Sequence, residues 1–298
     1  GRGKADIRVV PQLLEQPLVF LDGGTGTMLQ ARGLKPGERT ELWNVERPEE
    51  LVALHRSYIE AGADIVNTNT FGINKFHYHE NAAHTIPELV QAAVENVRKA
   101  IGETGADRDI FISLDLGPTG EFLEPYGDLT FDEAYDNYRQ LVQAGAAAGA
   151  DSISIETMFS CEEAKVALKA CRDHSSLPVL VSFSFSENGR LLSGETVEQV
   201  AAAAEEYGAA AVGFNCGFGP EQMKPLAAEM LKCTSLPVIV KPNAGLPDTS
   251  SGEAKYTMGP EEFAGIMEDI VQMGVKLIGG CCGTTPAFIS QLNRRFRK

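Results

Sequence analysis

The residues best suited to chemistry are three cysteines in glycine-rich surroundings. Near the C-terminus the sequence reads "KLIGGCCGTTP" (276–286), in which Cys281 and Cys282 are adjacent. A third cysteine, Cys216, lies in "GFNCG" (213–217). Adjacent residues normally point apart, so two neighbouring thiols reach one ligand only where the backbone turns sharply, and glycine permits such a turn at low steric cost. The two segments together therefore predict a site built from thiols.

Four interpretations of these thiols remain open at this point. Zinc takes cysteine sulfur at about 2.3 Å and prefers four tetrahedral ligands, so three thiolates would leave one position free, as in catalytic sites. A disulfide between adjacent residues would close a strained ring. A cysteine–histidine nucleophile would need a histidine on a predicted strand end, and none lies there. Free cysteine also packs as a small apolar residue, which is our interpretation of Cys161, Cys171 and Cys233 in predicted helices.

Two weaker motifs deserve a hypothesis each. His77 and His79 in "HYH" have a spacing that metal ligands also show, and they follow a predicted strand, although solvated loop histidines are common. The glycines of "GGTGTM" (23–28) resemble a phosphate loop only in composition, since neither a GKT or GKS ending nor G-x-G-x-x-G is present.

The elements that must position these residues form a regular series. Short β-rich runs bounded by glycine or proline alternate with helical stretches such as 48–62, 131–150 and 259–274, several of which end in glycine. The eight runs are 17–24, 63–71, 109–117, 151–158, 178–185, 209–217, 237–245 and 276–283. Repeated strand–helix units predict parallel strands, and the count favours a single-domain (β/α)₈ TIM barrel over an open doubly wound sheet. We expect residues 1–16 to form an N-terminal arm and 17–298 the barrel.

Barrel enzymes carry their chemistry on the loops that follow the strands. The predicted strand ends hold Asp22-Gly23-Gly24, Asn67 to Thr70, Asp115, Glu156-Thr157, Ser182, Ser184, Asn215-Cys216, Lys241-Pro242-Asn243 and Cys281-Cys282. Strands six and eight flank strand seven, so the three sulfurs can converge although they are far apart in sequence.

Composition excludes several function classes. The chain has 298 residues and a formal net charge of -15, which disfavours binding to phosphate backbones and thus to nucleic acids. No apolar run approaches the roughly 20 residues that span a bilayer. We find no charged-then-apolar leader, and the few unevenly spaced cysteines suit a reducing compartment, so we expect a cytoplasmic protein without membrane contact.

The motifs resemble those of the homocysteine S-methyltransferase family over nearly the whole chain. The resemblance rests on "GFNCG" and "GGCCGTTP", and on "FLDGGTGT", "TNTFG", "LGPTGE" and "KPNAGLP" at other strand ends. It is closest to the homocysteine-binding module of cobalamin-dependent methionine synthase. The family is a (β/α)₈ barrel that uses zinc to activate the homocysteine thiol for methylation.

The resemblance implies a role for each matching residue. Cys216, Cys281 and Cys282 would bind Zn²⁺, and Asn243 is our expected fourth ligand when substrate is absent. Asp22 and Glu156 would hold the ammonium of homocysteine. The amides of Gly23 and Gly24 would face its carboxylate, and we also count Asn215 among the substrate-binding residues. Three thiolates more than neutralise the ion, which keeps a bound substrate sulfur electron-rich, whereas a hydrolytic zinc site usually uses histidine.

The resemblance leaves the methyl donor open. One hypothesis is that the chain, as a module or a separate subunit of methionine biosynthesis, receives the methyl group from cobalamin carried on a partner protein or module. The loops 72–80 and 117–130 would then form the contact rim. A second is a stand-alone enzyme that uses S-methylmethionine or betaine. Two further alternatives are a zinc-binding barrel without turnover and a zinc hydrolase or lyase.

Overall fold

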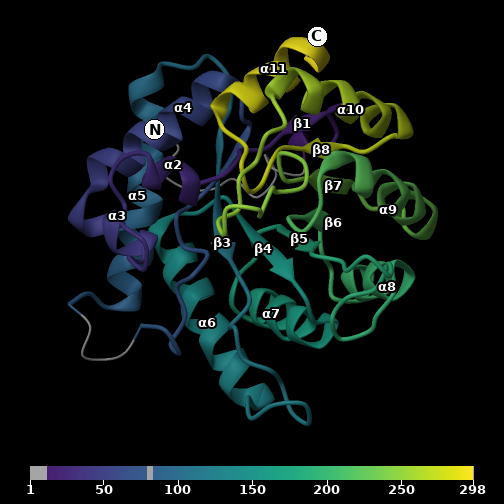
Figure 1. The fold of residues 1–298 in the computed structure, drawn as a ribbon. Coiled ribbons are helices and arrows are strands. Elements are labelled where there is room, and N and C mark those ends of the chain that lie inside the picture. The colour runs from purple at the N-terminus through teal and green to yellow at the C-terminus, as the bar shows by residue number, and fades with distance from the viewer. Residues whose placement is uncertain (1–11, 79–82, 298) are drawn as a thin grey trace.

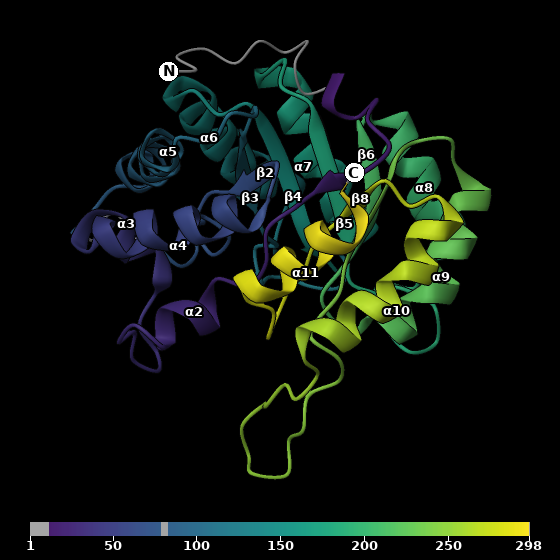
Figure 2. The same cartoon turned by 90° about the horizontal axis from the view of Figure 1, so that it is seen from above.

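Eight parallel strands form the centre of the protein, and helices surround them (Figures 1 and 2). The computed structural model describes residues 12–78 and 83–297. The strands pair in the order β1-β8-β7-β6-β5-β4-β3-β2, and a bridge between Leu21 and Ile65 joins the two ends of this series. The sheet therefore closes into the predicted (β/α)₈ barrel, and the open-sheet alternative is wrong.

Each predicted run contains one strand, and the helices follow the strands in alternation. The strands are β1 (Val19–Phe20), β2 (Ile65–Asn67), β3 (Phe111–Leu116), β4 (Ser152–Met158), β5 (Val179–Phe183), β6 (Ala211–Asn215), β7 (Val238–Lys241) and β8 (Leu277–Ile278). The helices are α2 (Gly26–Gln30), α3 (Trp43–Glu46), α4 (Pro48–Ala61), α5 (Ile86–Thr104), α6 (Phe131–Ala148), α7 (Cys161–His174), α8 (Val197–Glu206), α9 (Pro220–Cys233), α10 (Pro260–Met273) and α11 (Pro286–Phe296), with a 3-10 turn at Thr40–Leu42.

Local sequence explains where these helices begin and end. The side chain of Thr130 accepts the backbone N–H of Glu133, and Glu133 in turn accepts the N–H of Thr130, so a capping box begins α6. The predicted glycine ends are confirmed for α4, α6 and α10, where Gly62, Gly149 and Gly274 adopt left-handed conformations. The chain then turns directly into the next strand.

The barrel interior has an apolar layer and a polar layer. On β2, β5 and β7 the inward residues are Ile65, Leu180 and Ile239, which join a buried apolar cluster with Leu13 and Leu14 of the N-terminal segment. Two positions further along the same strands stand Asn67, Ser182 and Lys241, which line a cavity of about 10 Å³. Because alternate residues of a strand share one face, these polar residues form the next layer, toward the loops that follow the strands. That cavity has room for about one water, so any larger ligand of the barrel would have to lie on the loop side of the layer.

The remaining cysteines belong to helices, as predicted. Cys161 and Cys171 lie buried in α7, and Cys233, at the end of α9, packs partly exposed against the core. Among the helices of the described ranges, none combines the length and apolar character required to cross a membrane.

Candidate metal and substrate site at the barrel mouth

Three cysteine sulfurs converge at the loop side of the barrel. Cys216 follows β6, and Cys281 and Cys282 follow β8, with β7 between them. The Sγ atoms of Cys216 and Cys282 are 3.5 Å apart, and all three sulfurs lie within 4.8 Å of one another. A tetrahedral ion at about 2.3 Å from each sulfur requires sulfurs roughly 3.8 Å apart. The triad therefore fits a metal ion of this kind with little movement.

The backbone of both cysteine segments is fixed by β7 and the loop that follows it. Cys216 donates its N–H to the carbonyl of Lys241 at 3.2 Å, and Cys281 donates to the carbonyl of Pro242 at 2.8 Å. The N–H of Cys282 reaches Oδ1 of Asn243 at 3.1 Å. After the pair, Gly283 takes a positive φ of 80°, and a side chain there would collide with the ring of Tyr256. These bonds supply the sharp turn that two adjacent ligands need.

Hydrogen bonds among the three thiols favour the ionisation of one of them even without a cation. Hydrogen bonds from Cys281 and Cys282 lower the pKa of the Cys216 thiol, because they stabilise its thiolate. The same bonds, from the donor side, raise the pKa of Cys281 well above its ordinary value. One thiolate thus forms readily, whereas a cation is needed to ionise all three, since a coordinating thiol loses its proton outright.

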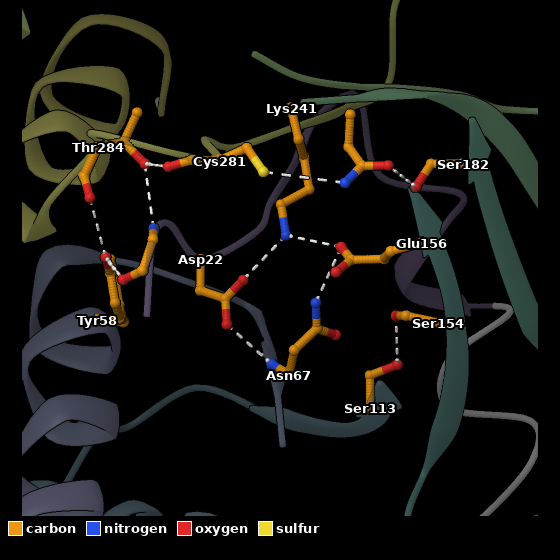
Figure 3. Close-up of polar contacts among 12 residues, drawn as sticks. Asp22, Tyr58, Asn67, Ser113, Ser154, Glu156, Ser182, Lys241, Cys281 and Thr284 are labelled. Atoms are coloured by element: carbon orange, nitrogen blue, oxygen red, sulfur yellow. Dashed lines mark hydrogen bonds and ion pairs between the residues drawn. The ribbon is translucent and has the colours of Figure 1, made fainter. Parts of the chain in front are cut away.

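A buried lysine joins the two carboxylates beside the triad (Figure 3). Nζ of Lys241 lies 3.1 Å from Oδ1 of Asp22 and 3.1 Å from Oε1 of Glu156. Asn67 donates its backbone N–H to Asp22 and its side-chain amide to Glu156. Asp22, Asn67, Glu156 and Lys241 come from four strands, so this polar cluster spans the barrel. The sequence analysis expected both acids here but assigned no role to Lys241 or Asn67.

Charge pairing keeps most of this cluster ionised despite its burial. Burial alone would lower the pKa of Lys241, but Glu156 and Asp22 raise it well above its ordinary value. Burial opposes ionisation of Glu156 as well, yet Lys241 lowers its pKa, helped by hydrogen bonds from Asp115 and other neighbours. For Asp22, burial is the largest influence and raises the pKa, while Lys241 acts against it. The lysine is therefore the charge that permits carboxylates at this depth.

Asp115 differs from the other acids because it has no cation of its own. Burial, and then the neighbouring Glu156, raise its pKa well above the ordinary range. A protonated Asp115 can donate to Glu156, which accounts for the hydrogen bond between these two acids. Asp115, the third acid at this site, therefore acts as a neutral donor.

The glycines after β1 have a packing reason of their own. A side chain at Gly23 would collide with the hydroxyls of Thr284 and Tyr58, and one at Gly24 with the carbonyls of Thr284 and Cys281. The amide of Gly24 donates to Oγ1 of Thr284 at 3.1 Å. These glycines allow the loop after β1 to lie directly against the loop that carries the cysteine pair.

Known proteins resemble this chain over almost its whole length. The family model described as homocysteine S-methyltransferase matches residues 19–296. The chain belongs to the homocysteine S-methyltransferase family. Methionine synthase of Mycobacterium tuberculosis is 33% identical over 296 residues, which are 94% of this chain and 25% of that protein. Methionine synthase of Mycobacterium leprae is likewise 33% identical, over 24% of its length. The chain thus spans about a quarter of the curated relatives it matches.

Solved structures agree with this assignment. The metallated form of the homocysteine methyltransferase MmuM from Escherichia coli is 25% identical, with a TM-score of 0.81, and the match covers 97% of this chain and 99% of that one. Its barrel and this one thus correspond over their whole length, which confirms the recognition of the family from its motifs.

The structure gathers most residues that the sequence singled out for this family's site. The three cysteines form the sole cluster of potential metal ligands found within the described ranges. His77 is not part of it, and its ring bonds the amide of Asn74 instead, while His79 lies outside the described residues. Lys241 was the main residue missed. The sequence did contain a signal for it: Lys241 ends the apolar strand "PVIVK". A lysine buried at such a position needs acidic partners nearby.

The raised pKa of Asp115 predicts how the stability of the protein depends on pH. Because its folded pKa is raised, folding retains a proton that the unfolded chain releases above about pH 4, so Asp115 reduces stability as pH rises, by up to about 1.4 kcal/mol per unit. Asp115→Asn keeps a donor toward Glu156 and removes this titration. Urea unfolding between pH 4.5 and 8.5 should show the variant gaining stability relative to wild type as pH increases. The exposed Asp128→Asn serves as the control, and parallel curves for Asp115→Asn and wild type would refute the assignment.

Proposed function

We propose that this barrel binds Zn²⁺ through Cys216, Cys281 and Cys282 and activates the thiol of homocysteine for methylation to methionine. The observation that carries the proposal is the position of the thiol triad next to the carboxylates of Asp22 and Glu156. The thiols suit a soft metal and a substrate sulfur, and the carboxylates suit an ammonium group. Homocysteine carries both chemical groups in one small molecule.

Zinc would hold the substrate sulfur as a nucleophilic thiolate near neutral pH, as it does for coordinated thiols in general. The protein residues then place the rest of the substrate. Asp22 and Glu156 would accept hydrogen bonds from the ammonium on the loop side of the polar layer, beside the Nζ of Lys241. Gly23 and Gly24 would lie near the carboxylate, although the N–H of Gly24 already donates to Thr284. Asn243, whose Oδ1 is at the cysteine turn, remains the predicted fourth ligand before substrate binds.

We infer that the methyl group arrives on a corrinoid carried by a partner protein or module. Two observations support this donor: the methionine synthases that match are about four times longer than this chain, and the mouth is rimmed by apolar side chains. Six of the large exposed apolar residues within the described ranges lie on the loops after β2, β3, β4, β5 and β7, namely Phe71, Phe122, Tyr126, Phe159, Leu192 and Leu246. Exposed apolar side chains at one end of a barrel suit contact with another protein. Of the two loops predicted as the rim, 117–130 contains Phe122 and Tyr126, and Phe71 directly precedes 72–80.

A stand-alone enzyme that uses S-methylmethionine or betaine is the second candidate. The match to MmuM favours it, since that homocysteine methyltransferase has the length of this barrel. Both candidates share the same thiol chemistry.

Free thiols at all six cysteines suit a reducing compartment, and we propose the cytoplasm.

The metal assignment predicts which cysteines hold zinc. Cys281→Ser should lose most of its zinc and its methyltransferase activity while the barrel stays folded, because the triad lies in loops outside the core. Cys233→Ser, in α9, is the matched control and should keep both. Metal analysis by mass spectrometry and zinc-edge X-ray absorption provide the measurements, and homocysteine should add one sulfur to the zinc shell. Full zinc occupancy in Cys281→Ser would overturn the assignment, and a shell unchanged by homocysteine would favour a zinc-binding barrel without turnover.

The substrate assignment predicts weaker binding without loss of metal. Asp22→Asn and Glu156→Gln should each weaken homocysteine binding by about 1.5–3 kcal/mol, the usual worth of a charge-assisted hydrogen bond. Calorimetric titration of the zinc-loaded proteins measures this effect. Glu187→Gln, an exposed acid on the loop after β5, should bind homocysteine as wild type does. If both site variants kept full affinity, the ammonium would have to be held elsewhere.

The donor assignment predicts a ranking of methyl sources. Free methylcobalamin should methylate homocysteine slowly, a methyl-loaded corrinoid protein much faster, and methyltetrahydrofolate alone not at all. Replacing Tyr126 with Ser should slow the reaction with the corrinoid protein and leave the reaction with free methylcobalamin unchanged, since this rim residue is 90% exposed. Turnover with S-methylmethionine or betaine at ordinary enzyme rates of roughly 1–10³ per second, without corrinoid, would contradict the corrinoid donor. The stand-alone enzyme would then be the better assignment.

A further inference from the structure

Two residues at the mouth hold a backbone conformation that their side chains disfavour. Within the described ranges, Thr157 and Cys216 are the non-glycine residues with positive φ, each at 60°. This region is uncommon for any side chain, and for a β-branched residue such as Thr157 it is a true outlier. Strained residues persist only where the surrounding structure holds them.

The strain at Thr157 coincides with an irregularity in β4. Ile155 pairs with Val181, whereas Met158 pairs with Phe183, so β4 contains one residue more than β5 over this interval. Such a bulge changes the direction of the side chains within it. Glu156 is one of them, and its carboxylate reaches Lys241 from this bulge.

The amide of Asn215 holds the bulge in place. Oδ1 of Asn215 accepts the backbone N–H of Thr157 at 2.8 Å and the hydroxyl of Ser182 at 2.7 Å. Its Nδ2 donates to Oγ1 of Thr157 at 2.7 Å and approaches Sγ of Cys281 at 3.9 Å. Asn215 is almost completely buried, and protein groups occupy both acceptor and both donor positions of its amide. No position is left for a substrate atom.

We propose that Asn215 is a positioning residue that braces the β4 bulge, and that it does not contact the substrate. By bonding both the N–H and the hydroxyl of Thr157, it keeps this residue left-handed and so directs Glu156 toward the ammonium site. Because Cys216 is the next residue in the chain, one side chain fixes the carboxylate relative to the thiol triad. This inference rests on the proposed function, and it replaces the substrate contact that the sequence analysis expected of Asn215.

The experiment uses glycine to remove the need for the brace. In Asn215→Ala the backbone at Thr157 should relax to negative φ, and KM for homocysteine should rise by about tenfold or more, the loss expected for one charge-assisted hydrogen bond. At saturating Zn²⁺ the zinc content should stay at the wild-type level, since Asn215 approaches Sγ of Cys281 but provides no metal ligand itself. The double variant Asn215→Ala/Thr157→Gly should recover most of the lost affinity, because glycine adopts positive φ without strain.

The outcomes separate a brace from a direct contact. If Asn215 touched homocysteine, Thr157→Gly could not restore affinity, so an unrescued double variant would overturn the proposal, as would an unchanged KM in Asn215→Ala. Asn96→Ala removes another buried asparagine, one that bonds the carbonyl of Asn44 and is outside the brace, and controls for a general loss of stability. It should leave KM for homocysteine unchanged.

Two readouts keep the result independent of the proposed function. Crystal structures of Asn215→Ala with and without Thr157→Gly report the backbone at position 157 directly, so failure of the wild-type protein to bind homocysteine would refute the function while the brace is still decided. If Asn215→Ala did not fold, refolding upon addition of Thr157→Gly would support the brace. A double variant that also failed to fold would contradict it.

Discussion

The ammonium of Lys241 is the interaction on which the mouth of the barrel depends. Two carboxylates at this depth would repel each other and lose their hydration, which is costly unless an opposite charge replaces the water. Lys241 supplies that charge to Asp22 and Glu156 simultaneously. Lys241 ends β7, Asp22 follows β1 and Glu156 belongs to β4. One side chain therefore joins three parts of the ring. The acidic pair that the proposed function assigns to a substrate ammonium can be held at this depth because the ammonium of Lys241 already pairs with both acids.

The strand that carries Lys241 also organises the thiol site. The carbonyls of Lys241 and Pro242 accept the N–H groups of Cys216 and Cys281, and Asn243 accepts that of Cys282. Three successive residues, the last of β7 and the two that follow it, thus determine where both cysteine segments lie. The carboxylates of Asp22 and Glu156 on one side and the sulfurs on the other are thus held by the same short stretch of backbone. A shift of β7 would therefore displace the thiol triad and the two acids together.

The fold and the sulfur triad were predictable from the sequence, whereas the polar connections were not. The eight strands appear as apolar runs because both faces of a barrel strand are buried, and the cysteines end two of them. Lys241 and Asn67 looked like ordinary strand ends, because their importance comes from residues more than 80 positions away that only the closed ring brings near. Thr157 gave no signal at all, since a bulge depends on how two strands align and not on local propensity. The bonds of Asn215, on which its proposed role as a brace rests, were hidden for the same reason: Thr157, Ser182 and Cys281 are more than 30 positions away in sequence.

Charge alternation explains how so many acids coexist at the mouth. With Asp115 protonated, and with Asp22 and Glu156 both ionised as the proposed function requires, the cluster would contain two carboxylates and one ammonium and would retain one uncompensated negative charge. The ammonium of an amino acid would cancel that charge without displacing Lys241. A thiol compound that lacks the amino group would leave it unpaired in a poorly hydrated site, where an unpaired charge is unfavourable. Under the proposed function, the charges that the protein itself supplies would therefore favour amino acid thiols over simple thiols.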